Sequence, residues 1–145
     1  MCEQHATSTP AVPRQSRRAV AYRPADARRD VRRAVTERCR DRALTCAEET
    51  LQDALLVASE LTANAILHGG GITSFEVDVD TCGVRLSVSD RSDEFPDTTA
   101  GLASEADRSR TGGRGWPIVS LLARDVRVAG LPRGGKCVTA VVPLR

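Results

Sequence analysis

Residues 60–90 read ELTANAILHGGGITSFEVDVDTCGVRLSVSD, and this stretch indicates a helix that is followed directly by a β-hairpin. Apolar and small side chains recur at helical spacing up to His68, where the glycines at 69–71 end the helix. Residues 73–80 and 84–90 then alternate apolar and polar side chains about a turn at 81–83. This alternation predicts two antiparallel strands that share one buried face.

The same reasoning extends outward in both directions along the chain. The helix that ends at His68 is expected to begin near Ala47, with Thr45 as its N-cap. A polar connection at 91–111 is long for a compact domain, which favours a role such as covering a ligand. The remaining predicted elements are an edge strand ended by Pro24 (17–23), a first helix (26–42), a short helix (117–123) and two closing strands (125–129 and 137–142).

The order of these elements predicts an α+β fold in a single domain. A length of 145 residues suffices for one hydrophobic core. Because the strands come largely as hairpins, we expect a two-layer sandwich, with helices on one face of a mixed, mostly antiparallel sheet. Residues 1–15 lack periodicity and are expected to form a disordered leader, which leaves 16–145 as the folded domain.

Composition and cysteine spacing indicate the cellular compartment of the protein. The sequence contains no apolar run near the roughly 20 residues of a membrane helix, and its first 18 residues lack the apolar region of a secretory signal. The five cysteines are scattered, and Cys39 and Cys46 are the only pair close in sequence. This pattern predicts free thiols in a reducing compartment and therefore a cytoplasmic protein.

Arginines crowd the N-terminal part of the chain although the net charge is only +2. Such a run can contact nucleic acid or an acidic partner, or it can be a solvated helix face. No stacking aromatic residues accompany these arginines, so the solvated face is the favoured interpretation.

Three polar residues of the second helix are candidates for chemistry. Glu60, Asn64 and His68 are spaced four apart and therefore lie on one stripe of the helix. A carboxylate and a carboxamide one turn apart can hold a divalent cation or position a water molecule. The alternative is a solvent-facing polar side, in which His68 serves as a helix C-cap.

Two further candidates lie on either side of the polar connection. Asp90 ends the hairpin, where a carboxylate can accept a hydrogen bond from a ligand amino group or can simply initiate a turn. The sequence Gly112-Gly113-Arg114-Gly115 precedes the short helix. Glycines at a helix start let phosphates approach free N–H groups, and Arg114 can add a bidentate contact; the alternative is a flexible turn.

Taken in order, these segments resemble the GHKL ATP-binding superfamily, which includes Hsp90, type II topoisomerases, MutL and histidine kinases. The stretch from Glu60 to Gly69 is similar to the N-box, and Val88-Ser-Asp90 to the G1 box. Residues 113–115 resemble the G2 box and 134–139 the G3 region. The short length and the ending Val-Val-Pro-Leu (141–144) are most similar to stand-alone anti-sigma-factor serine/threonine kinases, especially arginine-rich actinobacterial members. The resemblance implies the Bergerat-type ATP-binding fold.

The resemblance also implies ATP and Mg²⁺ as cofactors and assigns residue roles. Glu60 would be the general base that deprotonates an attacking hydroxyl or water, and Asn64 would coordinate Mg²⁺. Asp90 would accept a hydrogen bond from the adenine amino group, and residues 91–111 would form a lid over the nucleotide. The other residues expected to contact the nucleotide are His68, Gly113, Arg114, Gly115 and Trp116.

The activity implied is phosphorylation of a serine or threonine on an anti-anti-sigma protein of STAS type, with or without sequestration of a sigma factor. A homodimer is also expected, whereas direct contact with nucleic acid or membrane is not.

Two departures from the family pattern keep other functions open. The G1 box usually continues Asp-x-Gly-x-Gly, whereas Asp90 is followed here by Arg-Ser-Asp-Glu. Lys136 and Cys137 stand where adjacent threonines are common in the G3 box. These departures favour a non-catalytic module that binds a sigma factor or its antagonist, with ATP structural or absent. A third hypothesis is an arginine-rich nucleic-acid binder.

Overall fold

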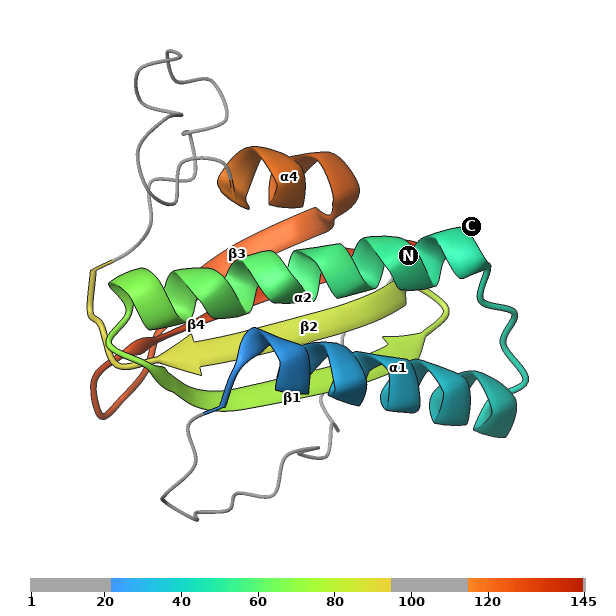
Figure 1. The fold of residues 1–145 in the computed structure, drawn as a ribbon, viewed down its shortest axis with the longest axis horizontal. Coiled ribbons are helices and arrows are strands. Elements are labelled where there is room, and N and C mark those ends of the chain that lie inside the picture. Colours follow the sequence, from blue (N-terminus) through green and yellow to red (C-terminus); the bar gives the residue numbers. More distant parts are fainter. Residues whose placement is uncertain (1–21, 95–114, 145) are drawn as a thin grey trace.

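The computed structural model describes residues 22–94 and 115–144, in which helices cover one face of a β-sheet (Figure 1). The expected leader at 1–15 and edge strand at 17–23 lie outside the described residues, apart from Tyr22 and Arg23, which precede the first helix. The described elements are, in chain order, α1 (Pro24–Asp41), α2 (Glu48–His68), β1 (Ile72–Asp80), β2 (Gly83–Asp90), α4 (Gly115–Leu122), β3 (Arg124–Gly130) and β4 (Lys136–Val142).

The sheet has the strand order β1-β2-β4-β3, and each neighbouring pair is antiparallel. The hairpin predicted from residues 73–80 and 84–90 is confirmed as β1 and β2. β4 lies between β2 and β3, so the last strand of the chain completes the middle of the sheet. The α+β two-layer prediction is confirmed, and the sheet of the described residues is antiparallel throughout rather than mixed.

The core lies between the sheet and the helices. Val84, Leu86 and Val88 alternate along β2 with at most 1% of each residue exposed. In the register of the sheet they lie opposite Val142, Ala140 and Val138 of β4. Burying a valine or leucine side chain stabilises a fold by roughly 1.5–3 kcal/mol. Period-two alternation of apolar residues therefore decides which face of the sheet the helices cover.

α2 is the central helix and lies between α1 and α4 (Figure 1). It packs on β2, while α1 packs on β1. Asp78 of β1 accepts hydrogen bonds from Arg38 at 2.9 Å and from Arg42 at 3.0 Å, which ties the end of α1 to the sheet. In the described part of the chain, none of the helices has the length and apolar character that crossing a bilayer requires.

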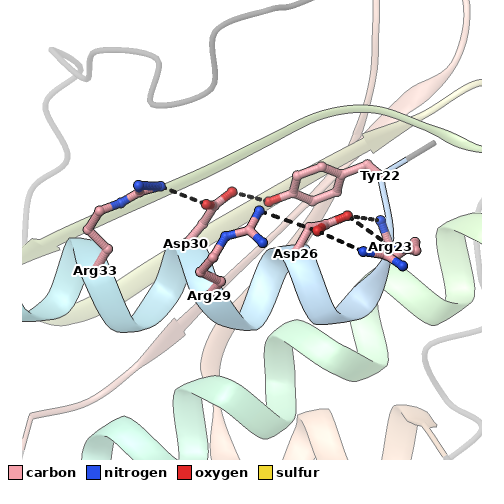
Figure 2. A network of polar contacts seen from close by, with 6 residues as sticks. All are labelled: Tyr22, Arg23, Asp26, Arg29, Asp30 and Arg33. Atoms are coloured by element: carbon pink, nitrogen blue, oxygen red, sulfur yellow. Dashed lines mark hydrogen bonds and ion pairs between the residues drawn. The ribbon is translucent and has the colours of Figure 1, made fainter. Parts of the chain in front are cut away.

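A polar network holds the start of α1 (Figure 2). The backbone N–H of Arg23 donates to the Asp26 carboxylate at 2.9 Å, and the Arg23 side chain pairs with the same carboxylate. The hydrogen bond from the Arg23 side chain is the largest of the effects that lower the pKa of Asp26. The Tyr22 hydroxyl donates to Asp30, and burial, followed by that hydrogen bond, raises the pKa of Tyr22 far above its ordinary value.

Both long helices begin within two residues of their predicted starts. α1 begins at Pro24 rather than Asp26, because proline suits the first helical turn, where its missing N–H has no partner to lose. The N-cap of α2 is Ala47, and Thr45 lies outside the helix, so the predicted Thr45 cap is wrong. The glutamates at the start of α2, Glu48 and Glu49, stabilise its positive end instead.

The expectation of free thiols is wrong for Cys39, Cys46 and Cys82, which are disulfide-bonded. Cys39 and Cys46 form a disulfide with a sulfur–sulfur distance of 2.02 Å and Cα atoms 6.6 Å apart. The chain reverses after α1, and this reversal brings two cysteines seven residues apart within bonding reach. Cys137, in contrast, is a free thiol.

Candidate functional site

The C-terminal half of α2 carries two of the predicted site residues on the flank that faces away from α1. Ser59 faces α1, because Arg28 donates to its hydroxyl at 3.2 Å. Asn64 comes five residues later, which places it about 140° around the helix from Ser59. Glu60 lies one turn before Asn64 on the same side. Both residues therefore lie on a side of α2 that is turned away from this contact with α1, and α4 packs on α2 from the side opposite α1 (Figure 1).

Glu60 and Asn64 keep their hydrogen-bonding capacity for a ligand. The Nδ2 atom of Asn64 is buried and has no hydrogen-bond partner. Leaving a buried polar group unpaired costs about 1–3 kcal/mol, so such a group in a folded protein needs an explanation. Glu60 is half-buried, and its carboxylate has no hydrogen bond or ion pair with residues 22–94 or 115–144. A bound ligand would satisfy both groups.

Asp90 is buried at the end of β2, with 4% of the residue exposed. The Lys136 ammonium, from the first residue of β4, lies 3.0 Å from Oδ1 and 2.9 Å from Oδ2 of this carboxylate. The backbone N–H of Ser92 donates to Oδ1 at 2.9 Å. Asp90 is therefore held by two neighbouring segments, and its charge is balanced within the protein.

Two glycines let the backbone approach Asp90 closely. A Cβ atom on Gly69, the C-cap of α2, would lie 2.4 Å from Cγ of Asp90. A Cβ atom on Gly135 would lie 2.2 Å from the carbonyl oxygen of Asp90, and Gly135 has a φ of +91°. The N–H of Arg91 also donates to the carbonyl of Gly69 at 2.9 Å. These contacts bring together the end of α2, the end of β2 and the start of β4.

The helix geometry connects the two halves of the candidate site. Asn64 precedes Gly69 by five residues, or about 7.5 Å along the helix axis. The side chain of Asp90 lies directly against Gly69. A ligand that contacts Asp90 and extends back along this side of α2 would therefore reach Asn64 and then Glu60. This span suits a base followed by a chain of phosphates.

The other predicted site residues are placed differently. His68 is exposed at the last position of α2. Trp116 follows Gly115 at the start of α4, and its side chain belongs to the hydrophobic core with 7% exposed. Gly113 and Arg114 lie outside the described residues, as does most of the lid predicted at 91–111. Their contacts with a nucleotide stay predictions.

The described residues suit a Mg²⁺ site in which phosphate oxygens complete the coordination shell of the metal. Among the described residues, no group of three or more His, Cys, Asp or Glu side chains could hold a metal ion. Mg²⁺ commonly takes only one or two protein ligands and completes its shell with phosphate oxygens and water. The amide of Asn64 suits this role, because turning it about its last bond exchanges the buried nitrogen for an oxygen.

The chain also has a cavity at the opposite end of α2. It has a volume of 360 Å³ and lies beside the Cys39–Cys46 disulfide. None of the predicted site residues lines it. The lining residues are Val35, Thr36, Cys39, Arg40, Leu44, Cys46, Ala47, Glu48 and Leu51.

The pairing of Lys136 with Asp90 was not predicted from the sequence, in which Lys136 stands out as a departure from the family pattern. The available signal was its position at the start of the last predicted strand, since Lys136 is the only lysine of the chain. Recognising the pair requires the register between β2 and β4, in which Asp90 lies opposite Lys136.

Comparison with known families assigns the chain to one of them. Residues 20–142 match the family model described as the histidine kinase-like ATPase domain. This match spans most of the 145-residue chain and includes every described element. A search of curated proteins finds no match.

Proposed function

Because the chain belongs to the histidine kinase-like ATPase domain family, we propose that it is a Mg²⁺-dependent serine/threonine kinase that acts on a regulatory protein. The family accounts for ATP as the ligand. The observation that supports transfer chemistry is the placing, on one side of α2, of a Glu60 carboxylate that has no partner among the described residues and an Asn64 side chain whose buried Nδ2 atom is unsatisfied. In this proposal, a ligand that contacts the buried carboxylate of Asp90 would extend back along α2 past Asn64 to Glu60.

The proposed reaction uses these residues in turn. The hydroxyl oxygen of a substrate serine or threonine attacks the γ-phosphorus of ATP, the bond to the bridging oxygen breaks, and ADP leaves. Glu60 accepts the proton of the attacking hydroxyl. Asn64 would hold Mg²⁺, which neutralises charge on the phosphates when bound. Asp90 would orient the base through its amino group.

The substrate class in this proposal comes from the resemblance described above. It is an anti-anti-sigma protein of STAS type, and a sigma factor is the second partner that the chain would sequester. A cytoplasmic location is part of the same proposal.

Replacing Glu60 with glutamine tests the proposed base. Glu60→Gln keeps the size of the side chain but removes its basic carboxylate, so Mg·ATP binding should persist. Phosphoryl transfer from γ-labelled ATP to candidate anti-anti-sigma proteins of the same genome should fall by about 10²–10⁴-fold. Titration calorimetry measures the binding, and autoradiography measures the transfer.

The matched control is Glu76→Gln. Glu76 is also half-buried, but it lies on β1, in the sheet layer rather than on α2. Its transfer rate should equal that of the parent. Equal transfer by Glu60→Gln and the parent would refute the role of Glu60, whereas ATP binding with no transfer by the parent would favour the non-catalytic module.

A further inference from the structure

We propose that Lys136 is a second base-reading residue beside Asp90, so that the site takes 6-oxopurine nucleoside triphosphates as well as ATP. This inference rests on the proposed function, because it concerns the base end of the same nucleotide site. Lys136 would then be a determinant of base specificity that the sequence position of Asp90 does not reveal.

The two charged residues form a preorganised pair. Asp90 and Lys136 lie directly opposite each other on antiparallel strands, at the end of the sheet where α2 terminates. Their side chains are 4% and 7% exposed, and the ammonium lies within 3.0 Å of both carboxylate oxygens. A buried charge that loses its partner is strongly destabilising. Lys136 therefore stays beside Asp90 unless a ligand offers it another acceptor.

The hydrogen bonds of the pair leave one acceptor site and one donor adjacent to each other. Oδ1 of Asp90 accepts from Lys136 and from the N–H of Ser92, which uses both of its lone pairs. Oδ2 lies 2.9 Å from the Lys136 ammonium in the ion pair and accepts no hydrogen bond from the described residues, so it retains a lone pair. An ammonium has three N–H donors, and the carboxylate engages at most two. The pair thus presents a free acceptor next to a free donor.

This combination suits the edges of two kinds of purine. Adenine offers an amino group at C6 as a donor and N1 as an acceptor. A 6-oxopurine offers O6 as an acceptor and N1–H as a donor, so the same two groups are present in exchanged order. An aspartate alone would accept from the adenine amino group and would repel O6 of a 6-oxopurine. With Lys136 beside it, either base finds one donor and one acceptor.

Binding of ATP, ITP and GTP, each with Mg²⁺, to the full-length protein tests the inference. Inosine is the sharpest probe, because it differs from adenosine only at the C6 edge. The parent should bind ITP within about tenfold of ATP, since each base makes one charge-assisted hydrogen bond. In Lys136→Met the ratio of the ITP and ATP dissociation constants should rise by about 10- to 100-fold, because O6 loses its donor.

Two control variants isolate the effect. Arg133→Met removes an exposed cation from the turn just before β4 and should leave the ITP/ATP ratio unchanged. Lys136→Arg keeps a charged donor next to Asp90 and should also keep the ratio near that of the parent. Circular dichroism and urea unfolding show whether Lys136→Met is folded; if it is not, the parent ratio and Lys136→Arg decide.

The outcomes separate this inference from the proposed function. A parent that prefers ATP over ITP by more than about 100-fold, or an unchanged ratio in folded Lys136→Met, overturns the role of Lys136 while ATP binding stands. ATP binding that appears only in Lys136→Met would make Lys136 a competitor of the base, which also overturns it. Absence of all nucleotide binding in the parent and both Lys136 variants would refute the proposed function itself.

Discussion

Individual residues around Asp90 are packed so closely that two neighbouring glycines should differ in their tolerance of a side chain. Gly134 and Gly135 both have positive φ, at +100° and +91°. A Cβ on Gly135 would lie 2.2 Å from the carbonyl oxygen of Asp90, whereas the nearest atom to a Cβ on Gly134 is 3.9 Å away. Gly135→Ala should therefore reduce the free energy of unfolding by about 1–3 kcal/mol more than Gly134→Ala.

Urea unfolding of both variants measures this difference. Gly134→Ala serves as the control, because it introduces the same backbone strain without the collision. Gly135→Ala should also weaken nucleotide binding, because relief of the collision displaces Asp90. Equal stability of the two variants would show that the contact between Gly135 and Asp90 leaves room for a methyl group at residue 135.

At the scale of an element, the start of α1 depends on a tyrosine that stays protonated. Burial and the hydrogen bond to Asp30 raise the pKa of Tyr22 above its ordinary value of 10.0. A raised pKa contributes stability that is fully present below pH 10 and is lost as the pH rises further. Tyr22 is the only tyrosine of the chain, so phenolate absorbance reports on it alone.

We expect the phenolate signal to appear only when the protein unfolds in alkali. Tyr22→Phe removes the titrating hydroxyl, so its free energy of unfolding should decline less steeply than that of the parent above pH 10. A phenolate titration near pH 10 in protein that remains folded by circular dichroism would contradict the buried hydrogen bond.

At the scale of the whole molecule, binding of a nucleotide should stabilise the folded protein. A ligand that binds only the folded state at 100 times its dissociation constant adds about 2.7 kcal/mol. Mg·ATP at that concentration should raise the melting temperature, and chelating Mg²⁺ should remove most of the gain. Asn64→Ala should lose the Mg²⁺-dependent part, while Asn64→Asp, which retains an oxygen ligand, should keep it.

Differential scanning fluorimetry with and without a chelator measures these shifts. The same shift in the presence and absence of Mg²⁺ would argue against a metal held at Asn64. No shift with any nucleotide would argue against the whole site.

Local patterns in the sequence were sufficient for the element types and for the layer architecture. The alternation in β1 and β2 and the helical spacing up to His68 both depend on which side chains avoid water, a property that each residue carries with it. The shared side of Glu60 and Asn64 on α2 was also predictable, because residues four apart lie on the same side of a helix. The first residue of α1 and the N-cap of α2 were less predictable, because several nearby residues can begin or cap a helix.

Contacts between distant segments decided the rest. The pairing of Asp90 with Lys136 depends on a strand register across 46 residues, and no local periodicity specifies that register. The Cys39–Cys46 disulfide depends on how the chain reverses between two packed helices. The tightness of Gly135 against Asp90 likewise exists only once β4 lies beside β2. Side-chain polarity acts on each residue separately, whereas these three features require particular atoms from separate segments to meet at bonding or contact distance.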